Sequence, residues 1–374
     1  MLMSTTIEGF QALPRLKRWK GRWVAWRNAV LASPHFQLWA ARLPLLSWVA
    51  RRRAVQAFDL VAGFCYSQVL AAAVQVGLLD LLRRGPCDLP GVIKASGLSQ
   101  AAALRLVRAA AALDLAEEVA PGWWLLGPQG AALQANPGAI AMVRHHALLY
   151  ADLADPVALL RADRAAPTAL SAFWHYAGNA PAPEAAAYSA LMATSQAMVA
   201  SQALGAYRFA RHRRVLDVGG GHGAFANAVA RACPRVDVGV FDLPPVIAGA
   251  QVDRRIVLHV GDFFRDPLPA GYDCITLVRV LHDHDDAACG ALLRAVHRAL
   301  PPGGRLVVAE PMAATAGAAA MGEAYFGLYL WAMNAGRPRS ACEYGAMLKN
   351  AGFSRWRRQA TDYPVVSSLI VAFR

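Results

Sequence analysis

The chain has 374 residues, of which 56% are hydrophobic and 17% are charged. This composition excludes a disordered, collagen-like or coiled-coil protein and indicates a globular chain with a large apolar core. The formal net charge is +13, but residues 1–53 alone hold ten Lys or Arg side chains against a single acidic residue, Glu8. Basicity therefore belongs to the N-terminal segment.

The six cysteines are scattered and form no Cys-x-x-Cys pair. This spacing argues against a disulfide framework or a zinc finger, so we expect no metal and a reducing compartment. The N-terminus lacks the short apolar run and the small-residue cleavage site of a secretory signal. The sequence therefore predicts a cytoplasmic protein.

Residues 1–55 form a basic arm that contains five of the ten tryptophans. Trp19, Trp23 and Trp26 follow helical i, i+4, i+7 spacing, so they share one helix face with Lys and Arg around them. Such a helix is typical of proteins that lie on an anionic membrane surface. Two alternatives remain: the tryptophans pack on a partner subunit, or the arm binds nucleic acid, which nothing else in the chain supports.

Residues 56–83 predict one long apolar helix that ends before the breakers Gly85 and Pro86. Within it, residues 60–79 carry no formal charge and are long enough to span a bilayer. Polar side chains and small residues dilute this stretch, which favours a buried helix over a membrane span.

Residues 72–133 have the pattern of a winged helix. A short helix in DLPGVIKASGLS precedes a longer helix opened by Ser99, and two strands follow around Pro121 and Gly122. The second helix offers only Arg105 and Arg108 as cations, which is sparse for reading DNA. We therefore expect residues 56–135 to form a helical, winged-helix dimerisation domain rather than a DNA-binding one.

The remaining chain divides into a helical linker and pocket wall over residues 136–205 and a catalytic domain over residues 206–374. In the latter, short strands alternate with helix-length stretches, which predicts an α/β fold with a parallel sheet wound on both faces. An antiparallel hairpin is expected at the sheet edge. The strand candidates are RVLDV, VDVGVF, IVLHV, CITLVRV, GRLVVAE, WRRQATDY and SLIVAF.

A glycine-rich loop follows the first of these strands, in VLDVGGGHGAF at residues 215–225. Gly219 and Gly221 let a ligand approach the backbone near a helix N-terminus. The spacing also satisfies the G-x-G-x-x-A variant of a dinucleotide fingerprint. Asp217, placed just before the glycines, favours a ligand with an ammonium group over a pyrophosphate.

Acidic residues also end the next two strands. Asp242, in FDLP, stands where a carboxylate can bind both hydroxyls of a ribose. Asp262 and Phe263, in GDFF, offer an acceptor and an apolar plate for a purine. Any one of these acids could instead cap a helix, but three on successive strand ends favour a nucleoside site.

The fourth strand delivers LVRVLHDHDD, residues 277–286, to the same edge of the sheet. His282 there can serve as a general base, or it can merely pack while Asp283 or Asp285 caps the next helix. Glu310, which ends the fifth strand, can orient an imidazole from the fourth.

These motifs, in this order and with the closing GRPRSACEY and LKNAGF, resemble the small-molecule O-methyltransferases related to plant caffeic-acid and animal hydroxyindole enzymes. The resemblance covers roughly residues 56–374. It implies a homodimer with an N-terminal winged-helix dimerisation domain and a C-terminal, Rossmann-like sheet that binds S-adenosylmethionine.

The resemblance also implies roles for single residues. Gly219 and Gly221 would line the methionine part of the cofactor, Asp242 the ribose, and Asp262 with Phe263 the adenine. Arg279 stands near a position where relatives place a cation close to the cofactor. His282 matches the catalytic base and Glu310 one of its two acidic partners.

The match departs from the family where plant members have GKER-T, since the second acidic partner is replaced by Pro338. Glu343 lies nearby but matches a non-catalytic position. The segment 321–334 is expected to supply a pocket wall, with an ordinary core helix as the alternative, or both on opposite faces. Its candidate wall residues are Phe326, Tyr329, Leu330, Trp331 and Met333.

A narrower similarity covers the arm and the first long helix. The run SPHFQLWAARLPLLSWVARRRAVQAFDLVAGFCYSQVL is similar to the N-terminal region of the carotenoid 1-hydroxyl O-methyltransferases of purple phototrophic bacteria. This implies a hydrophobic carotenoid of the demethylspheroidene or hydroxyneurosporene type as acceptor, and a site at the inner or photosynthetic membrane. Alternatives are a phenolic or quinone acceptor, a relative that binds the cofactor without transferring methyl, and a winged-helix regulator.

Overall fold

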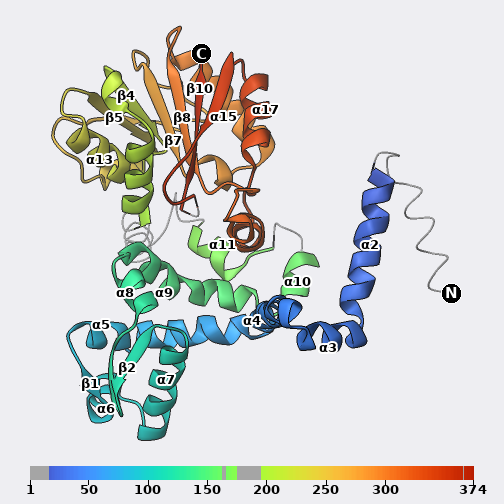
Figure 1. Ribbon diagram of the computed structural model, residues 1–374. Coiled ribbons are helices and arrows are strands. Elements are labelled where there is room, and N and C mark those ends of the chain that lie inside the picture. The colour runs from blue at the N-terminus through green and yellow to red at the C-terminus, as the bar shows by residue number, and fades with distance from the viewer. Residues whose placement is uncertain (1–16, 162–165, 175–194, 365) are drawn as a thin grey trace. The chain divides into compact units, whose positions relative to one another are not determined.

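The computed structural model describes residues 17–161, 166–174, 195–364 and 366–374 (Figure 1). The chain divides into two units, residues 1–72 and 73–374. Residues 162–165 and 175–194 of the expected linker over 136–205 lie outside the described residues.

From residue 17 on, the first unit contains three helices in the order of the sequence, and the third of them runs on into the second unit. Their bounds are α2 Arg18–Ala32, α3 Pro34–Arg42 and α4 Pro44–Gln75. Ser33 starts α3, because its hydroxyl accepts a hydrogen bond from the Phe36 N–H. The helix predicted for the tryptophan face is confirmed, and Trp19, Trp23 and Trp26 are all more than half exposed.

The long helix differs from the prediction at both ends. It begins at Pro44 and ends at Gln75, where Gly77 adopts a left-handed φ of 72° and separates it from α5 (Leu78–Arg83). The prediction of a buried helix over 60–79 is wrong for its first half: Leu60 is 88% exposed and Phe64 72%. Within α4, burial among the described side chains begins only at Ala71.

Helix α4 has a further property that bears on membranes. Its residues Leu46–Gln75 form a helix long and apolar enough to cross a bilayer, by length and composition alone. Within the part of the chain that the structure describes, no other helix meets these two conditions.

The winged-helix prediction is confirmed. Its elements are β1 Cys87–Asp88, α6 Leu89–Ser96, α7 Gln100–Ala112, β2 Ala116–Ala120, β3 Trp123–Leu126 and α8 Pro128–Gln134. The strands form an antiparallel sheet of order β1-β3-β2. Ser99 caps α7 as expected, and the wing turns at Gly122, whose φ is 77°. Trp124, almost fully buried, points inward from β3.

Helices α9 Pro137–Asp152, α10 Pro156–Arg161 and α11 Ala169–Trp174 follow, and residues 195–206 are helical as well. The large sheet then has the order β6-β5-β4-β7-β8-β10-β9, with β10 antiparallel to both of its neighbours. Its strands are β4 Arg214–Val218, β5 Asp237–Asp242, β6 Val257–Val260, β7 Cys274–Val278, β8 Arg305–Glu310, β9 Arg355–Gln359 and β10 Ser368–Phe373. All seven predicted strands and the antiparallel hairpin are confirmed.

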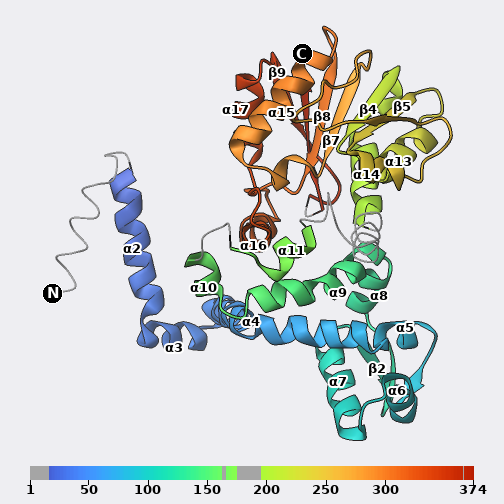
Figure 2. The ribbon, with the colours of Figure 1, turned by 180° about the vertical axis from the view of Figure 1, so that it is seen from behind.

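Helices cover both faces of this sheet, with α13 on one face and α15 and α17 on the other (Figures 1 and 2). One core packs Phe225 and Val229 of α13 against the sheet, and a second packs Leu292 of α15 and Tyr344 of α17 against its other face. The central strands are apolar on both sides for this reason. The bounds of the remaining elements are η3 Phe209–Arg211, α13 Ala224–Ala232, α14 Pro244–Ala248, η4 Leu281–Asp283, α15 Asp286–Ala299, η5 Ala320–Tyr325, α16 Phe326–Ala332 and α17 Ala341–Asn350.

Candidate active site

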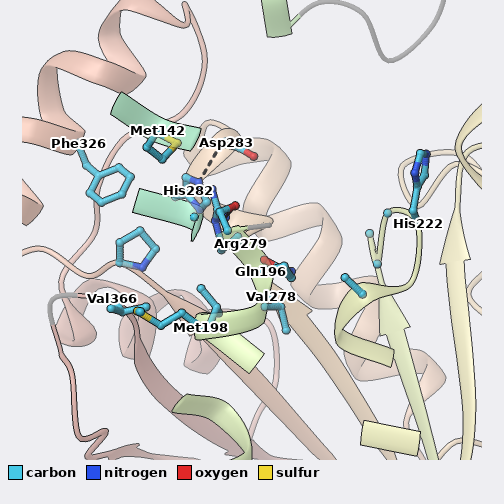
Figure 3. Close-up of a pocket in the computed structure, with 18 of the residues that line it drawn as sticks. Met142, Gln196, Met198, His222, Val278, Arg279, His282, Asp283, Phe326 and Val366 are labelled. Carbon is cyan, nitrogen blue, oxygen red and sulfur yellow. Dashed lines mark hydrogen bonds and ion pairs between the residues drawn. The ribbon is translucent and has the colours of Figure 1, made fainter. Parts of the chain in front are cut away.

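A cavity of about 490 Å³ lies at the carboxyl ends of β4, β5 and β7, the edge where open α/β sheets bind ligands. Residues of α9 and of the η5–α16 segment line it as well. In Figure 3, Met142, Phe326 and His282 lie at one end of the cavity and His222 at the other. The cavity therefore joins an apolar region beside His282 to the glycine-rich loop.

The glycine-rich loop lines the cavity, and its conformation requires glycine. Gly219 and Gly221 have left-handed φ angles of 68° and 58°. A Cβ on Gly219 would also stand 2.9 Å from Cγ2 of Val280. The loop thus exposes backbone at the cavity as the sequence predicts.

Asp242 is joined to this loop and also lines the cavity. Its Oδ2 accepts a hydrogen bond of 2.8 Å from the Gly221 N–H, and its Oδ1 one of 2.7 Å from the Leu243 N–H. Burial raises the pKa of its carboxyl above the ordinary value. Each carboxylate oxygen keeps a second lone pair for a ligand hydroxyl.

Asp217 does not line the cavity. Its side chain is 1% exposed and lies against Gly220, where an added Cβ would stand 2.6 Å from Oδ2. Thr276 donates a 2.7 Å hydrogen bond to Oδ1, while Oδ2 has no partner among the described residues. Burial raises the pKa of this carboxyl to about 7. The structure therefore does not bring Asp217 into direct contact with the cavity.

Asp262 and Phe263 also stand outside the cavity lining. Asp262 accepts a 2.8 Å hydrogen bond from the Phe264 N–H, and its other oxygen pairs with Arg265 at 3.6 Å. The Phe263 ring lies next to the loop, since a Cβ on Gly219 would be 3.6 Å from its Cε1. Their role beside a purine remains a prediction.

Arg279 lines the cavity from the residue after β7. Its backbone has a φ of 58°, which is unusual for a residue other than glycine. Its Nη1 donates a 2.7 Å hydrogen bond to Oγ of Ser195, a cavity residue that the sequence did not single out.

His282 and Glu310 meet as predicted. His282 lies in η4, is 5% exposed and lines the cavity, and its Nδ1 is hydrogen-bonded to Oε2 of Glu310. The fully buried Glu310 also accepts hydrogen bonds from the N–H groups of Val280, at 3.0 Å, and Leu281, at 2.8 Å. One carboxylate thus fixes both the turn that carries the imidazole and the position of the ring.

The sequence left open whether Asp283 or Asp285 caps the helix that follows His282, and the structure gives the two residues different positions. Asp285 caps α15, since its Oδ1 accepts from the Ala288 N–H at 2.8 Å. Asp283 instead lines the cavity and its Oδ1 lies 3.1 Å from Nε2 of His282. Burial lowers the pKa of His282, but the charges of Asp283 and Glu310 outweigh it and hold that pKa above 6.5.

The position of the missing second acid, Pro338, is flanked by two arginines that hold the His282 turn. Arg339 is fully buried and donates to the carbonyl oxygens of Leu281, at 2.8 Å, and His284, at 2.7 Å. Its Nη2 also pairs with Asp286 at 2.7 Å. Arg339 was not predicted, although the segment that contains it was singled out for the proline.

Glu343 binds Arg337 and Ser340 and not His282, as expected from its match to a non-catalytic position. Its Oε1 binds Nη1 of Arg337 at 2.7 Å, and its Oε2 forms a capping box with Ser340 at the start of α17. Gly336 is required in the same segment, because its φ is 63° and a Cβ there would lie 1.7 Å from the carbonyl oxygen of His282.

The helical segment 321–334 serves both expected purposes on opposite faces. Phe326, Tyr329 and Met333 line the cavity, and the Phe326 ring centroid lies 6.3 Å from that of His282. Leu330 is buried in a core cluster, and Trp331 donates a 3.1 Å hydrogen bond to the Leu159 carbonyl. Neither of these two lines the cavity.

The cavity residues on this side that the sequence did not single out include Met142 of α9 and Tyr325 at the end of η5. The π-helical geometry of η5 turns Tyr325 and the adjacent Phe326 toward the same cavity. No periodic pattern in the sequence signals such a turn.

A Rossmann-like sheet with this loop, an acidic residue ending the second strand and a buried His–Glu pair defines a methyltransferase that uses S-adenosylmethionine. The O-methyltransferase domain family matches residues 150–354, and the O-methyltransferase dimerisation domain matches residues 58–128. The chain therefore belongs to the S-adenosylmethionine-dependent O-methyltransferases.

Individual relatives agree with this assignment. The chain is 44% identical to demethylspheroidene O-methyltransferase of Rhodobacter capsulatus, over 89% of this chain and 85% of that protein. It is 43% identical to the enzyme of the same name from Cereibacter sphaeroides, over 91% and 93%.

Solved structures share the fold. CalO1, a methyltransferase of calicheamicin biosynthesis in its SAH-bound form, matches with a TM-score of 0.73 and 26% identity over 86% of this chain and 98% of that one. Human N-acetylserotonin methyltransferase in complex with SAM matches with a TM-score of 0.72 and 23% identity over 86% and 97%.

Proposed function

We propose that this O-methyltransferase methylates the tertiary C-1 hydroxyl of an acyclic carotenoid of the demethylspheroidene or hydroxyneurosporene type. The observation that carries the proposal is the position of His282, which Glu310 holds beside Phe326 and the apolar side chains of α9 and segment 321–334. Met142, Phe326 and Met333 suit a hydrocarbon end with a single oxygen. The names of the two bacterial relatives support the same acceptor.

The loop residues fit the cofactor. A Cβ on Gly219 would crowd Val280, so the loop keeps bare backbone at the cavity, and the Asp242 carboxylate, bound to the Gly221 N–H, has lone pairs left for a ligand. When bound, S-adenosylmethionine supplies a methyl group on a sulfonium leaving group. We assign Gly219, Gly221 and Asp242 to its methionine and ribose parts, and Arg279 to the same region of the cavity.

Three further residues would act from outside the cavity lining. Asp217 has a buried Oδ2 without a partner among the described residues, directly under the loop. It would support the loop from below and act on the ammonium group at a distance rather than by contact. Asp262 and Phe263 would complete the adenine side, next to Gly219.

His282 acts as the base in this proposal. Glu310 keeps the proton on Nδ1, so that Nε2 is the nitrogen that accepts the hydroxyl proton. The Asp283 carboxylate now beside Nε2 marks the position that the acceptor hydroxyl takes. A positioned base contributes about 10²–10⁴-fold to the rate. A tertiary alcohol is a weaker acid than a phenol, so the base matters more here.

The test is incubation of the protein with methyl-labelled cofactor and either a 1-hydroxylated acyclic carotenoid or a panel of phenols and quinones. Label in the carotenoid, with an equal amount of S-adenosylhomocysteine, is expected. If only a phenol or a quinone gains label, the proposed carotenoid acceptor is wrong. If no S-adenosylhomocysteine forms with any acceptor, the protein transfers no methyl group.

We also propose that the protein is a homodimer. The dimerisation domain match over 58–128 supports this, and so do the exposed apolar side chains of α4. Phe58, Val61 and Phe64 are each more than 60% exposed in the single chain. Large exposed apolar surfaces of this kind mark an interface. Sedimentation equilibrium of the full chain should give twice the monomer mass.

The arm is proposed to hold the enzyme peripherally on an anionic membrane, where such an acceptor resides. Trp19 is 71% exposed, Trp23 51% and Trp26 62%, and α2 has no acidic residue in its first turn. Arg27 stacks on the Trp23 ring at 5.2 Å, so cation and indole occupy the same surface. Each basic residue near an anionic surface contributes about 1 kcal/mol.

Co-sedimentation with vesicles tests the arm. Full-length protein should pellet with anionic vesicles at low salt and less with neutral ones, and Trp19→Ala, Trp23→Ala and Trp26→Ala together should release it. Trp123→Ala, which removes an exposed tryptophan outside the arm, is the matched control and should stay bound. Full-length protein that remains in the supernatant with anionic vesicles would refute the membrane role.

A further inference from the structure

Two histidine–tyrosine pairs join α9 to the helical segment that lines the cavity. His146 Nε2 lies 2.7 Å from the Tyr325 hydroxyl, and His145 Nε2 lies 2.8 Å from the Tyr329 hydroxyl. Both tyrosines line the cavity. The chemistry at His282 uses none of these four side chains.

Tyr325 and His282 both pack against the ring of Phe326. Its ring centroid is 5.0 Å from that of Phe326, and the Phe326 centroid is 6.3 Å from that of His282. Apart from Tyr325 and Tyr329, the side chains that α9 and segment 321–334 contribute to the cavity are apolar, among them Met142, Met321, Phe326 and Met333. Burying a polar group in such a wall is unfavourable unless it is hydrogen-bonded. A phenylalanine would fill the same space without needing a partner.

We propose that Tyr325, held in place by His146, binds the hydroxyl oxygen of the acceptor and selects hydroxylated chain ends over hydrocarbon ones. This inference rests on the proposed function and adds a positioning and specificity residue to it. The oxygen would then be fixed from two sides, by the base at His282 and by the phenol at Tyr325.

The hydrogen-bonding capacity of the pair supports this assignment. Burial lowers the pKa of His146 and raises that of Tyr325, so both are neutral at physiological pH. One hydrogen bond between them leaves the phenol with either its O–H or an oxygen lone pair to offer. Among the described residues, His146 is the hydrogen-bond partner of this phenol. An alcohol oxygen can donate or accept and fits either arrangement, whereas a hydrocarbon end fits neither.

The proposal is tested with Tyr325→Phe, which removes only the hydroxyl. We expect the KM of the hydroxylated carotenoid to rise about 3- to 12-fold, with a smaller change in kcat and none in the Kd of S-adenosylmethionine. The Ki of the same carotenoid without its hydroxyl, used as a competitive inhibitor, should stay unchanged. A merely structural role of Tyr325 would change the KM of the hydroxylated carotenoid and the Ki of the hydrocarbon together.

His146 provides the second variant. His146→Ala should raise the acceptor KM in the same direction, and His146→Gln, which can still hydrogen-bond the phenol, should restore it. Tyr150→Phe is the matched control, because Tyr150 packs its ring on His146, 6.1 Å between centroids, but does not line the cavity. Methyl transfer by the unchanged protein tests the proposed function separately. Three results for Tyr325→Phe would each overturn the inference. They are an unchanged acceptor KM, an equal rise in the Ki of the hydrocarbon inhibitor, and weaker cofactor binding in place of a changed acceptor KM.

Discussion

Replacing Glu310 by glutamine changes the tautomer of the His282 ring while it keeps the ring in place. Glu310 accepts three hydrogen bonds, from the N–H groups of Val280 and Leu281 and from His282. The glutamine oxygen can keep the two backbone bonds, which turns its NH₂ group toward Nδ1. Nδ1 must then accept a hydrogen bond, so the ring carries its proton on Nε2, the nitrogen that has to act as the base.

The magnitude follows from two losses. The wrong tautomer becomes the favoured one, and the imidazolium formed in the reaction loses its charged partner; each change is worth about 1.5–3 kcal/mol for a hydrogen bond to a charged group. Together they amount to about 3–6 kcal/mol, or about 10²–10⁴-fold in kcat. Glu310→Ala would instead leave buried donors unpaired and destabilise the fold by about 3–5 kcal/mol.

Steady-state kinetics with saturating cofactor and calorimetric titration of the cofactor form the assay. Glu310→Gln should lose kcat while its thermal unfolding and its cofactor Kd stay close to those of the unchanged protein. Glu343→Gln is the comparison, because that carboxylate binds Arg337 and Ser340 and does not contact His282. A folded Glu310→Gln protein with near-normal kcat would refute the role of the His–Glu pair.

Four further outcomes are expected. His282→Ala should lower turnover by about 10²–10⁴-fold with cofactor affinity nearly unchanged, since it removes the base alone. The base must be unprotonated and its pKa is raised above 6.5, so kcat/KM should fall as pH is lowered through that raised pKa; in Glu310→Gln this limb should move to lower pH. Asp242→Ala should weaken cofactor binding by about 1–3 kcal/mol in calorimetry, because ribose hydroxyls lose a charged acceptor. Gly336→Ala should lower the Tm strongly, since its Cβ would overlap the His282 carbonyl, whereas Gly327→Ala, with open space around it, should not.

Most strands of the sheet were predictable because they are short apolar runs bounded by turn residues. Strand β9 is the exception, since Arg355–Gln359 carries three arginines, and it was predicted only as one strand of the antiparallel hairpin with β10. The long helix was not predictable in this way. Its start at Pro44 and its break at Gly77 depend on local backbone preferences, but its exposure depends on what packs against it, and a single sequence does not show that surface.

The candidate site was also predictable only in part. The pairing of His282 with Glu310 was predictable, because parallel strand ends meet at one edge of the sheet. Asp217 also lies near the end of a strand, but its side chain points to the buried side of the loop, and position alone does not reveal that direction. The buried contacts of Arg339 join segments that are more than 50 residues apart, so they require the folded chain.

The most direct test of the account is mass spectrometry of the pigments after full-length protein has been incubated with S-adenosylmethionine and a carotenoid that carries a tertiary C-1 hydroxyl. We expect the carotenoid to gain one methyl group at that oxygen, with an equal amount of S-adenosylhomocysteine and almost no product from the Glu310→Gln variant. Recovery of the unmodified carotenoid, from protein that binds the cofactor and methylates a phenolic acceptor instead, would contradict the proposed function.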